Sequence, residues 1–575
     1  MGVLSAPTRR ALRREPPPPP PSLGLLPFAG IVLLALVVRL LVLTELNGSP
    51  WLDVPVGDAK SYDTWARSIA GGDWFGREVF YQAPLYPYFL GTVYALFGTK
   101  LALARALQVA LGSLAAGLIG VAATRLTTRT AGIVAGALAA LYAPAVMYDI
   151  TLEKSSLGWF LTALLFYLGV ARPDPPPVRW ALAAGAALGA LALVRENALL
   201  LILALIASYG AARIVPLGLG MLLVLGPVAW RNHEVGGVFL PTASNAGVNF
   251  YIGNGAEADG LYRPLVAGRG HPDYERADAT RLAQELAGRE LTASEVSGVW
   301  FRRALQEIKA EPLHWGELVA RKTKLVFDRH EVMDAVALEV FADDSHVLGA
   351  LAPALGFGVL FPLFLGGLLV ASGGHRLLRF PLDALMALTV SLVLFFVAAR
   401  FRLTLVPFLL PFAALALVQG WRSRDRWIGL AGIVAAAALS WWPYALPGDA
   451  RATSYANLAN EYLRLEQPAE AERWARRACE RDPSSAEASF TLGMALRHQE
   501  KDGEAFPVLE RARELEPAYE ADVLAEQGAI RARAGDRAAA AELLERALAL
   551  DPQHEAALRY RRTLQGETED SQRSE

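Results

Sequence analysis

The sequence predicts an all-α polytopic membrane protein that ends in a short solenoid of helical repeats. Hydrophobic residues make up 53% of the 575 residues and charged residues only 19%, whereas a soluble chain contains about 25% charged residues. Long apolar runs alternate with polar segments up to residue 446, and an alanine- and glutamate-rich region of regular period follows. These observations predict a membrane domain over residues 27–446 and a repeat domain over residues 447–563.

Composition also excludes several classes of function. The net charge of −2 argues against nucleic acid as a partner, because nucleic-acid binding requires a strongly basic surface. Cys479 is the single cysteine, so no intrachain disulfide and no cysteine-based metal cluster can form. An arginine- and proline-rich segment, residues 1–26, and the polar end, residues 564–575, are predicted to be disordered tails.

Apolar runs of suitable length predict the membrane spans. A hydrocarbon core about 30 Å thick requires roughly 20 apolar residues in a helix. The run from Pro27 to Leu46 is too long for a cleaved signal peptide, and it is interpreted as the first span. About eleven spans are predicted, at residues 27–46, 101–123, 131–148, 156–171, 179–194, 197–212, 214–230, 348–371, 381–399, 403–420 and 427–446.

The distribution of arginine predicts the orientation in the membrane. Basic residues favour the cytoplasmic side of short loops, and they gather in the loops 125–130, 172–179, 211–213, 373–379 and 421–426. The N-terminus is therefore expected in the cytoplasm, with two large external loops at residues 47–100 and 231–346. An odd number of spans places the repeat domain outside the cell or in the periplasm, and an error of one span would reverse its side.

A repeat of constant period follows the last span. Pro483, Pro517 and Pro552 are separated by 34 and 35 residues, which is the period of a tetratricopeptide repeat. Small residues recur at fixed offsets between these prolines, including Ala471, Ala505 and Ala540 at one position of each unit and Ala478, Ala512 and Ala547 at another. Three such units are about the minimum that stacks stably. A plain stack of amphipathic helices is the alternative interpretation.

The first external loop contains the most informative acidic residues. Asp58, Tyr62 and Trp65 in the segment GDAKSYDTWARSIAGGDW share one face of a short helix at the membrane surface. An ionised aspartate there could act as a general base or hold a divalent cation. From the spacing alone, a solvated loop with incidental acids is the favoured interpretation.

The order of several segments resembles the lipid-dependent glycosyltransferases of the GT-C superfamily. Within that superfamily, the chain looks most like the glycosyltransferase family 39, or protein mannosyltransferase-like, group. The similar segments begin with Asp58 and continue with residues 81–98, 148–156, 193–201, 230–254 and 399–414. The resemblance departs from the family at Ala59, where many members have a glutamate.

The resemblance implies a function, a set of site residues and a GT-C type of membrane bundle with a periplasmic loop layer. A sugar would move from a polyprenyl-phosphate donor to a protein, lipid or glycan acceptor on the outer face of a bacterial inner membrane. Asp58 would be the general base. The other candidates are Glu153 for catalysis, Arg400, Arg402 and Arg195 for the donor phosphate, and Tyr62, Tyr81, Gln82, Lys154 and Asn249 for the substrate cavity.

Alternatives stay open for these residues and for the function. Arg400 and Arg402 could instead anchor a span end by snorkelling, and Asn249 could form a turn with its neighbouring glycines. No cofactor is required, although a divalent metal ion at Asp58 fits equally well. A surface-polysaccharide polymerase or ligase, and a non-catalytic scaffold that binds a protein partner through its repeats, are the competing functions.

Overall fold

The computed structural model describes residues 21–266, 269–270, 272–371, 376–420, 424–444 and 446–566. Every regular element in these ranges is a helix, which confirms the predicted all-α class. Most of the predicted N-terminal tail and of the tail after residue 563 lies outside the described residues. The predicted basic loops 373–379 and 421–426 also lie partly outside them.

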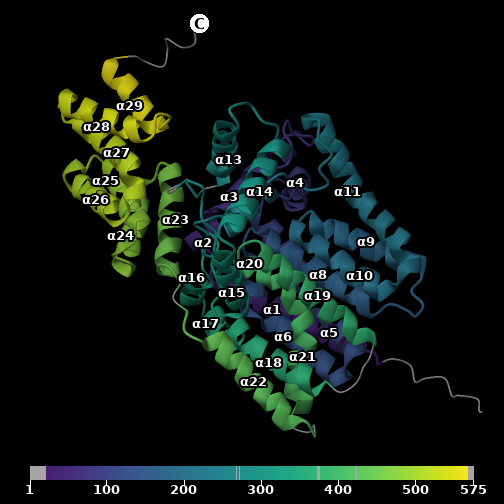
Figure 1. Ribbon diagram of the computed structural model, residues 1–575. Coiled ribbons are helices and arrows are strands. Elements are labelled where there is room, and N and C mark those ends of the chain that lie inside the picture. The colour runs from purple at the N-terminus through teal and green to yellow at the C-terminus, as the bar shows by residue number, and fades with distance from the viewer. Residues whose placement is uncertain are drawn as a thin grey trace, which may run out of the picture.

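The apolar helices form one bundle, in which α5 packs against α1, α6 and α8, while α18 packs against α21 and α22 (Figure 1). All eleven apolar runs predicted from the sequence fall on helices of this bundle. The helices are α1 (Leu25–Glu45), α5 (Leu101–Leu126), α6 (Arg129–Leu141), α7 (Ala143–Ile150), α8 (Lys154–Val170), α9 (Val178–Ala192), η1 (Glu196–Leu200), α10 (Leu201–Tyr209), η2 (Ala211–Arg213), α11 (Ile214–Gly236), α17 (His346–Ala354), α18 (Phe357–Val370), α19 (Arg376–Leu394), α20 (Ala399–Arg402), η3 (Leu403–Leu405), α21 (Val406–Gln419) and α22 (Arg426–Trp441).

The helices of the bundle differ in their capacity to cross a membrane. Five helical stretches in the described part of the chain are long and apolar enough, and α6 with α7, bent by 50°, would make a sixth. Other predicted spans, among them those at α8, α9, η1 together with α10, and α22, form apolar helices of only 10–17 residues. A helix rises about 1.5 Å per residue, so these are shorter than the hydrocarbon core is thick.

Exposed apolar side chains mark the surface that faces lipid. Leu222 and Leu223 on α11 are 62% and 72% exposed, and Trp427 on α22 is 67% exposed. Only 17% of the apolar window that includes α11 is buried in the protein, against 83% of the window that includes α21. Large apolar patches of this kind are unfavourable in water. The arrangement therefore places α21 in the centre of the bundle and α11 against the hydrocarbon.

An ion pair is buried inside the bundle. The Nε atom of Arg39, on α1, lies 2.6 Å from Oδ2 of Asp149, and both side chains are fully buried. Ser156 donates a hydrogen bond to the other carboxylate oxygen. A Cβ atom at Gly112 would lie only 1.8 Å from this carboxylate, so α5 needs a glycine there. Asp149 lies on α7, close to the end of that helix.

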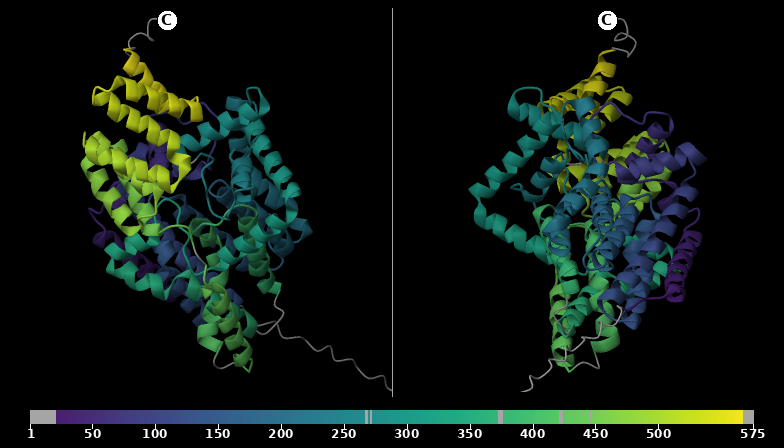
Figure 2. Two further views of the ribbon diagram at one scale, coloured as in Figure 1. Left: turned by 60° about the vertical axis from the view of Figure 1, so that its left-hand side comes forward. Right: turned by 90° about the vertical axis from the view of Figure 1, so that its right-hand side faces the viewer.

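Shorter helices form a layer over one end of the bundle (Figures 1 and 2). They come from the two large loops that the sequence predicted to be external. The predicted interfacial helix at Asp58 is present as α3, which packs against α4. The layer contains α2 (Pro50–Asp53), α3 (Asp58–Ala70), α4 (Leu85–Phe97), α12 (Ala246–Asn254), α13 (Pro272–Ala287), α14 (Ala293–Ala310), α15 (Pro312–Phe327) and α16 (Leu338–Asp344).

The C-terminal helices stack in pairs beside this layer (Figure 1). The repeat period of 34 and 35 residues is also present in the backbone. Equivalent turns have positive φ angles of 57–84° at Glu466, Glu500 and Gly535. The small residues that repeat in the sequence lie buried between the paired helices. The elements are α23 (Ala450–Arg464), α24 (Pro468–Arg481), α25 (Ala486–His498), α26 (Asp502–Leu515), η5 (Pro517–Tyr519), α27 (Glu520–Arg533), α28 (Arg537–Leu550) and α29 (Glu555–Gln565).

Candidate active site

Three carboxylates from distant parts of the chain meet at one arginine, where the layer joins the bundle. Nη1 of Arg400, on α20, lies 2.5 Å from Oδ2 of Asp58 and 2.5 Å from Oδ2 of Asp334. The same nitrogen lies 3.5 Å from Oε1 of Glu153. Arg400, Asp58 and Glu153 were all predicted site residues, and the structure brings them together.

Asp58 is held in place by its position at the start of α3 and by two neutral donors. Gly57 precedes it with a φ of 60°, a backbone conformation that glycine adopts without strain. The hydroxyl of Tyr62 donates to Oδ2 of Asp58 at 3.3 Å, and Nε2 of Gln82 donates to Oδ1 at 3.1 Å. Both partners were predicted as cavity residues, and both orient the carboxylate.

Arg195 adds a second guanidinium beside this cluster. Its Nη2 donates to Oγ of Ser155 at 2.6 Å, and that hydroxyl donates to Oε2 of Glu153 at 3.2 Å. Within the described residues, Nε and Nη1 of Arg195 are buried and have no hydrogen-bond partner. Unsatisfied buried donors are costly, so these two nitrogens are suited to an anionic ligand.

Lys154 supplies a further cationic group at the same place. It is the first residue of α8, next to Glu153 in the sequence, and its Nζ lies 5.8 Å from the centre of the Tyr62 ring. The predicted cavity residue Tyr81 contacts the layer rather than the shared arginine. Its hydroxyl donates to Glu275 of α13 at 2.9 Å.

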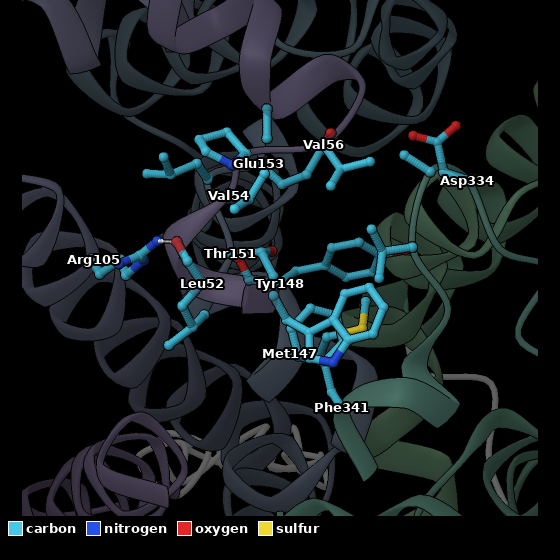
Figure 3. A pocket seen from close by; sticks show the side chains of 16 residues that line it. Leu52, Val54, Val56, Arg105, Met147, Tyr148, Thr151, Glu153, Asp334 and Phe341 are labelled. Carbon is cyan, nitrogen blue, oxygen red and sulfur yellow. Dashed lines mark hydrogen bonds between the residues drawn. The ribbon is translucent and has the colours of Figure 1, made fainter. Parts of the chain in front are cut away.

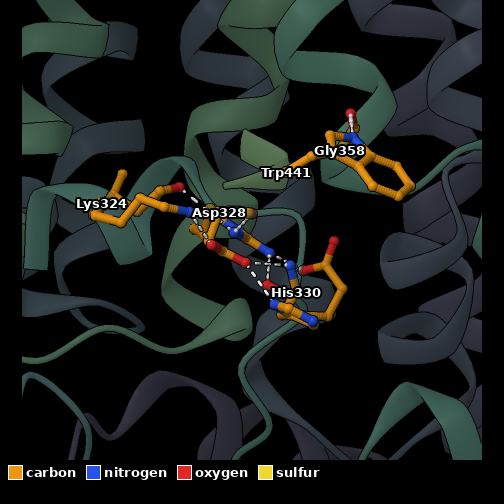
Figure 4. Close-up of polar contacts among 8 residues, drawn as sticks. Lys324, Asp328, His330, Gly358 and Trp441 are labelled. Atoms are coloured by element: carbon orange, nitrogen blue, oxygen red, sulfur yellow. Dashed lines mark hydrogen bonds and ion pairs between the residues drawn. The ribbon is translucent and has the colours of Figure 1, made fainter. Parts of the chain in front are cut away.

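Arg402 is directed away from the cluster. Its guanidinium donates to the carbonyl oxygens of Asp328 and His330, at 2.6 and 2.7 Å, and pairs with Glu331 at 2.5 Å. Residues two apart on a helix point about 200° apart, so Arg400 and Arg402 face different surroundings. Figure 4 shows the local network, in which Asp328 lies between Lys324 and His330.

Asn249, another predicted cavity residue, lies on α12, which packs against α14 within the layer. No side-chain hydrogen bond between Asn249 and the carboxylate cluster is present among the described residues. The structure therefore places the Arg402 guanidinium against the loop before α16, and Arg195, Lys154 and Arg400 are the predicted cations beside the carboxylates.

The shared guanidinium gives two of the acids different proton affinities. Burial alone would raise the pKa of Asp58, but the charges of Arg400 and Lys154 outweigh burial and lower this pKa to about 2. Burial raises the pKa of Asp334 to about 7, and the negative charge of Asp58 contributes to this rise against the opposing effect of Arg400. Near neutral pH, Asp58 is therefore ionised while Asp334 exchanges its proton.

The same acids have the chemistry of a cation site. Asp58, Glu153 and Asp334 each offer a carboxylate oxygen, and these three atoms lie within 4.8 Å of one another. Oxygen ligands of this kind suit a divalent cation. However, Nη1 of Arg400 already contacts all three carboxylates, so a cation would have to replace the guanidinium.

A pocket lies beside the carboxylates (Figure 3). Glu153 and Asp334 line its polar side, and most of its other walls are apolar, including Val56, Met147 and Phe341. Arg105 also lines it, but this guanidinium donates to the carbonyl oxygen of Leu52. The pocket thus presents an apolar compartment next to a charged one.

Sequence reasoning did not identify Asp334 or Ser155. Asp334 lies in the segment VMDAVAL, where one acid interrupts an apolar stretch inside a polar loop. That interruption was the available signal, because an acid buried among apolar residues costs free energy that a solvated acid does not. Ser155 carries no such signal in its sequence context.

Fold and site together define a helical, multi-pass membrane protein with a charged site under a layer of helices from its two large loops. Residues 81–224 match the family described as dolichyl-phosphate-mannose-protein mannosyltransferase, a match that covers about a quarter of the chain. Residues 452–485 match the tetratricopeptide repeat family. The first match agrees with the resemblance to protein mannosyltransferase-like enzymes, and the second agrees with the predicted tetratricopeptide repeats.

Solved structures were compared with the chain as well. ArnT from Cupriavidus metallidurans, bound to undecaprenyl phosphate, is 19% identical; the alignment covers 86% of this chain and 80% of ArnT, with a TM-score of 0.40. The oligosaccharyltransferase AglB from Archaeoglobus fulgidus, in complex with an inhibitory peptide and a dolichol-phosphate, is 13% identical; the alignment covers 78% of this chain and 59% of AglB, with a TM-score of 0.38. No curated protein matches the sequence.

Proposed function

We propose that this protein transfers a sugar from a polyprenyl-phosphate donor to a hydroxyl group at the membrane surface. The observation that carries the proposal is the contact of Asp58 with Arg400 beside Arg195, which joins a carboxylate and two guanidinium groups from three distant segments. A family match over the segment that contains Glu153 supports it. We further propose a bacterial inner membrane as the location, with the layer and the repeats on the outer side.

The residues divide between the two substrates. Arg195, Arg400 and Lys154 bind the donor phosphate, because guanidinium groups form paired, charge-assisted hydrogen bonds with phosphate oxygens. The polyprenyl chain remains in the hydrocarbon next to the bundle. Binding of phosphate to Arg400 draws this guanidinium away from Asp58, and the carboxylate then becomes a stronger base.

The transfer step follows from this arrangement. Asp58 accepts the proton of the acceptor hydroxyl as its oxygen forms a bond with the anomeric carbon of the sugar. The bond between that carbon and the phosphate oxygen breaks, and its electron pair leaves with polyprenyl phosphate. The negative charge that develops on the leaving phosphate is stabilised by the arginines.

A transfer assay tests the proposal directly. The full chain is placed in lipid vesicles with radiolabelled polyprenyl-phosphate sugars of several kinds, together with hydroxyl-bearing peptide, lipid and glycan acceptors. Label is expected to move from the lipid fraction to an acceptor and to leave unlabelled polyprenyl phosphate. Failure of the folded protein to transfer label from every donor would overturn the proposal and favour the scaffold function.

Arg195→Gln is expected to weaken donor binding. A hydrogen bond to a charged group contributes about 1.5–3 kcal/mol, so the KM for the donor should rise by about 10- to 100-fold. Arg172→Gln is the matched control, because Arg172 also donates to a serine, Ser208, and lies over an aromatic ring, but it does so away from the cluster. Equal donor KM values in Arg195→Gln and wild type would exclude Arg195 from the phosphate site.

Donor binding is also expected to depend on pH. Asp334, with its pKa raised to about 7, is neutral below that pH and negative above it, and a negative charge repels the donor phosphate. The donor KM should therefore rise as pH increases from 6 to 8, on the order of tenfold for one added charge at an intermediate effective dielectric constant. Asp334→Asn should abolish this rise, and a pH-independent KM in the wild type would contradict it.

A further inference from the structure

The loop that carries Asp334 is held from two sides. Its first half is fixed by the membrane domain: Arg402 donates to the carbonyl oxygens of Asp328 and His330, and the amide of Ala399 donates to the carbonyl oxygen of Val332 at 2.8 Å. The second half, which leads into α16, is fixed by the repeat domain. We name residues 328–337 the Asp334 loop.

The first repeat helix contacts the backbone of this loop directly. Nδ2 of Asn457, on α23, donates to the carbonyl oxygen of Ala335 at 2.8 Å. The amide of Ala337 donates to Oγ of Ser454 at 3.0 Å, and Ser454 is fully buried. The two bonded residues lie one and three positions after Asp334. Helix α23 therefore helps to fix the backbone position of Asp334.

A second contact links the repeats to the same pocket. Trp51 and Asp334 both line it (Figure 3). The Trp51 ring packs against Tyr455 of α23, with ring centres 6.0 Å apart, and against Trp474 of α24 at 5.4 Å. Aromatic contacts of this kind contribute about 0.5–1.5 kcal/mol each beyond the area that they bury. The repeats thus contact the lining of the pocket at two places.

The position of the loop also bears on Asp58. A Cβ atom at Gly57 would lie 2.8 Å from Cβ of Ala335, so the turn that begins α3 packs closely against the residue that Asn457 holds. Asp58 follows Gly57 directly, and Asp58 and Asp334 share Nη1 of Arg400. A shift of the loop would therefore alter the contact of Arg400 with both acids.

From these contacts we infer that α23 is a positioning element of the active site, with Ser454 and Asn457 as positioning residues for Asp334. The inference rests on the proposed glycosyl transfer and extends it: the repeat domain completes the site from outside the membrane domain. Misplacement of a reacting group by about 1 Å can cost on the order of 100-fold in rate, so modest movement of the Asp334 loop is sufficient to be measured.

The test uses the full chain with Ser454→Ala and Asn457→Ala combined. We expect kcat for sugar transfer to fall on the order of 10- to 100-fold, because the loop packs against Gly57 and its Asp334 shares Arg400 with Asp58. The rise of the donor KM between pH 6 and 8 should also become smaller, because Asp334 is no longer held at Arg400. Hydrogen exchange of the Ala337 amide should become faster, because its acceptor is removed. Asn460→Ala is the matched control, since Asn460 lies on the same helix but accepts from Thr491 of the second repeat.

The outcomes separate this inference from the proposed function. Faster exchange at Ala337 with unchanged kcat, or an equal loss of kcat in Asn460→Ala, would overturn the positioning role while glycosyl transfer stands. An unchanged exchange rate in the double variant would show that α23 does not hold the loop. A wild-type protein that transfers no sugar from any donor would overturn the proposed function, and the positioning role would fall with it.

Discussion

Asp58→Asn is expected to reduce the rate of sugar transfer by about 10²- to 10⁴-fold, which is the usual contribution of a general base. Asparagine has nearly the same size as aspartate, and one of the two donors, Tyr62 or Gln82, can still donate to its single carbonyl oxygen. It cannot accept the proton of the acceptor hydroxyl. The measurement is kcat for transfer of label from a polyprenyl-phosphate sugar, together with equilibrium binding of the donor, which should be retained.

Asp63→Asn is the matched control for this change. Asp63 lies on the same helix, is 7% exposed against 9% for Asp58, and also pairs with an arginine, Arg67, at 2.7 Å. It contacts Tyr94 rather than the cluster. Its replacement should leave kcat close to that of the wild type, and a comparable loss in both variants would show that the effect arises from damage to α3.

Arg39→Met is expected to destabilise the protein by about 3–5 kcal/mol, because it leaves the buried carboxylate of Asp149 without a counter-charge. Two apolar residues of similar volume can replace a buried pair at little cost. The double variant Arg39→Met with Asp149→Leu should therefore recover most of the lost stability. Melting temperatures in detergent, compared across the two single variants and the double variant, give the measurement.

Arg67→Met is the control for the loss of an arginine from an ion pair. The Arg67 side chain is 49% exposed where it pairs with Asp63, and exposed pairs contribute at most about 1 kcal/mol. If Arg39→Met lowered the melting temperature no more than Arg67→Met does, the pair between α1 and α7 would not stabilise the bundle. A double variant less stable than Arg39→Met would contradict the same conclusion.

The parts of the fold that the sequence predicted are those set by local pattern. The membrane helices follow from apolar length, and the stacked helices follow from a constant period, because both signals lie within a few tens of residues. Bends and early helix ends are not visible in hydropathy. The break between α6 and α7 at Tyr142, for example, divides one predicted apolar run into two shorter helices.

The site was predictable where a residue belonged to a motif and unpredictable where it belonged to a loop. Asp58, Glu153 and Arg400 were found because their segments occur in a familiar order. Asp334 was not, since a loop without periodicity gives no indication of which of its side chains points inward. Arg402 was grouped with Arg400 because both are basic and close in sequence, and the rotation between them becomes evident only in a folded helix.

The docking of α23 onto the layer has a practical consequence for imaging. Small membrane proteins are difficult to align in electron micrographs, since detergent hides most of their features. Here the repeats form a protrusion joined to the rest of the molecule by aromatic packing as well as by the chain, so it should serve as a built-in fiducial. A truncated protein that ends before Ala450 would lose that landmark and would expose Trp51 to solvent.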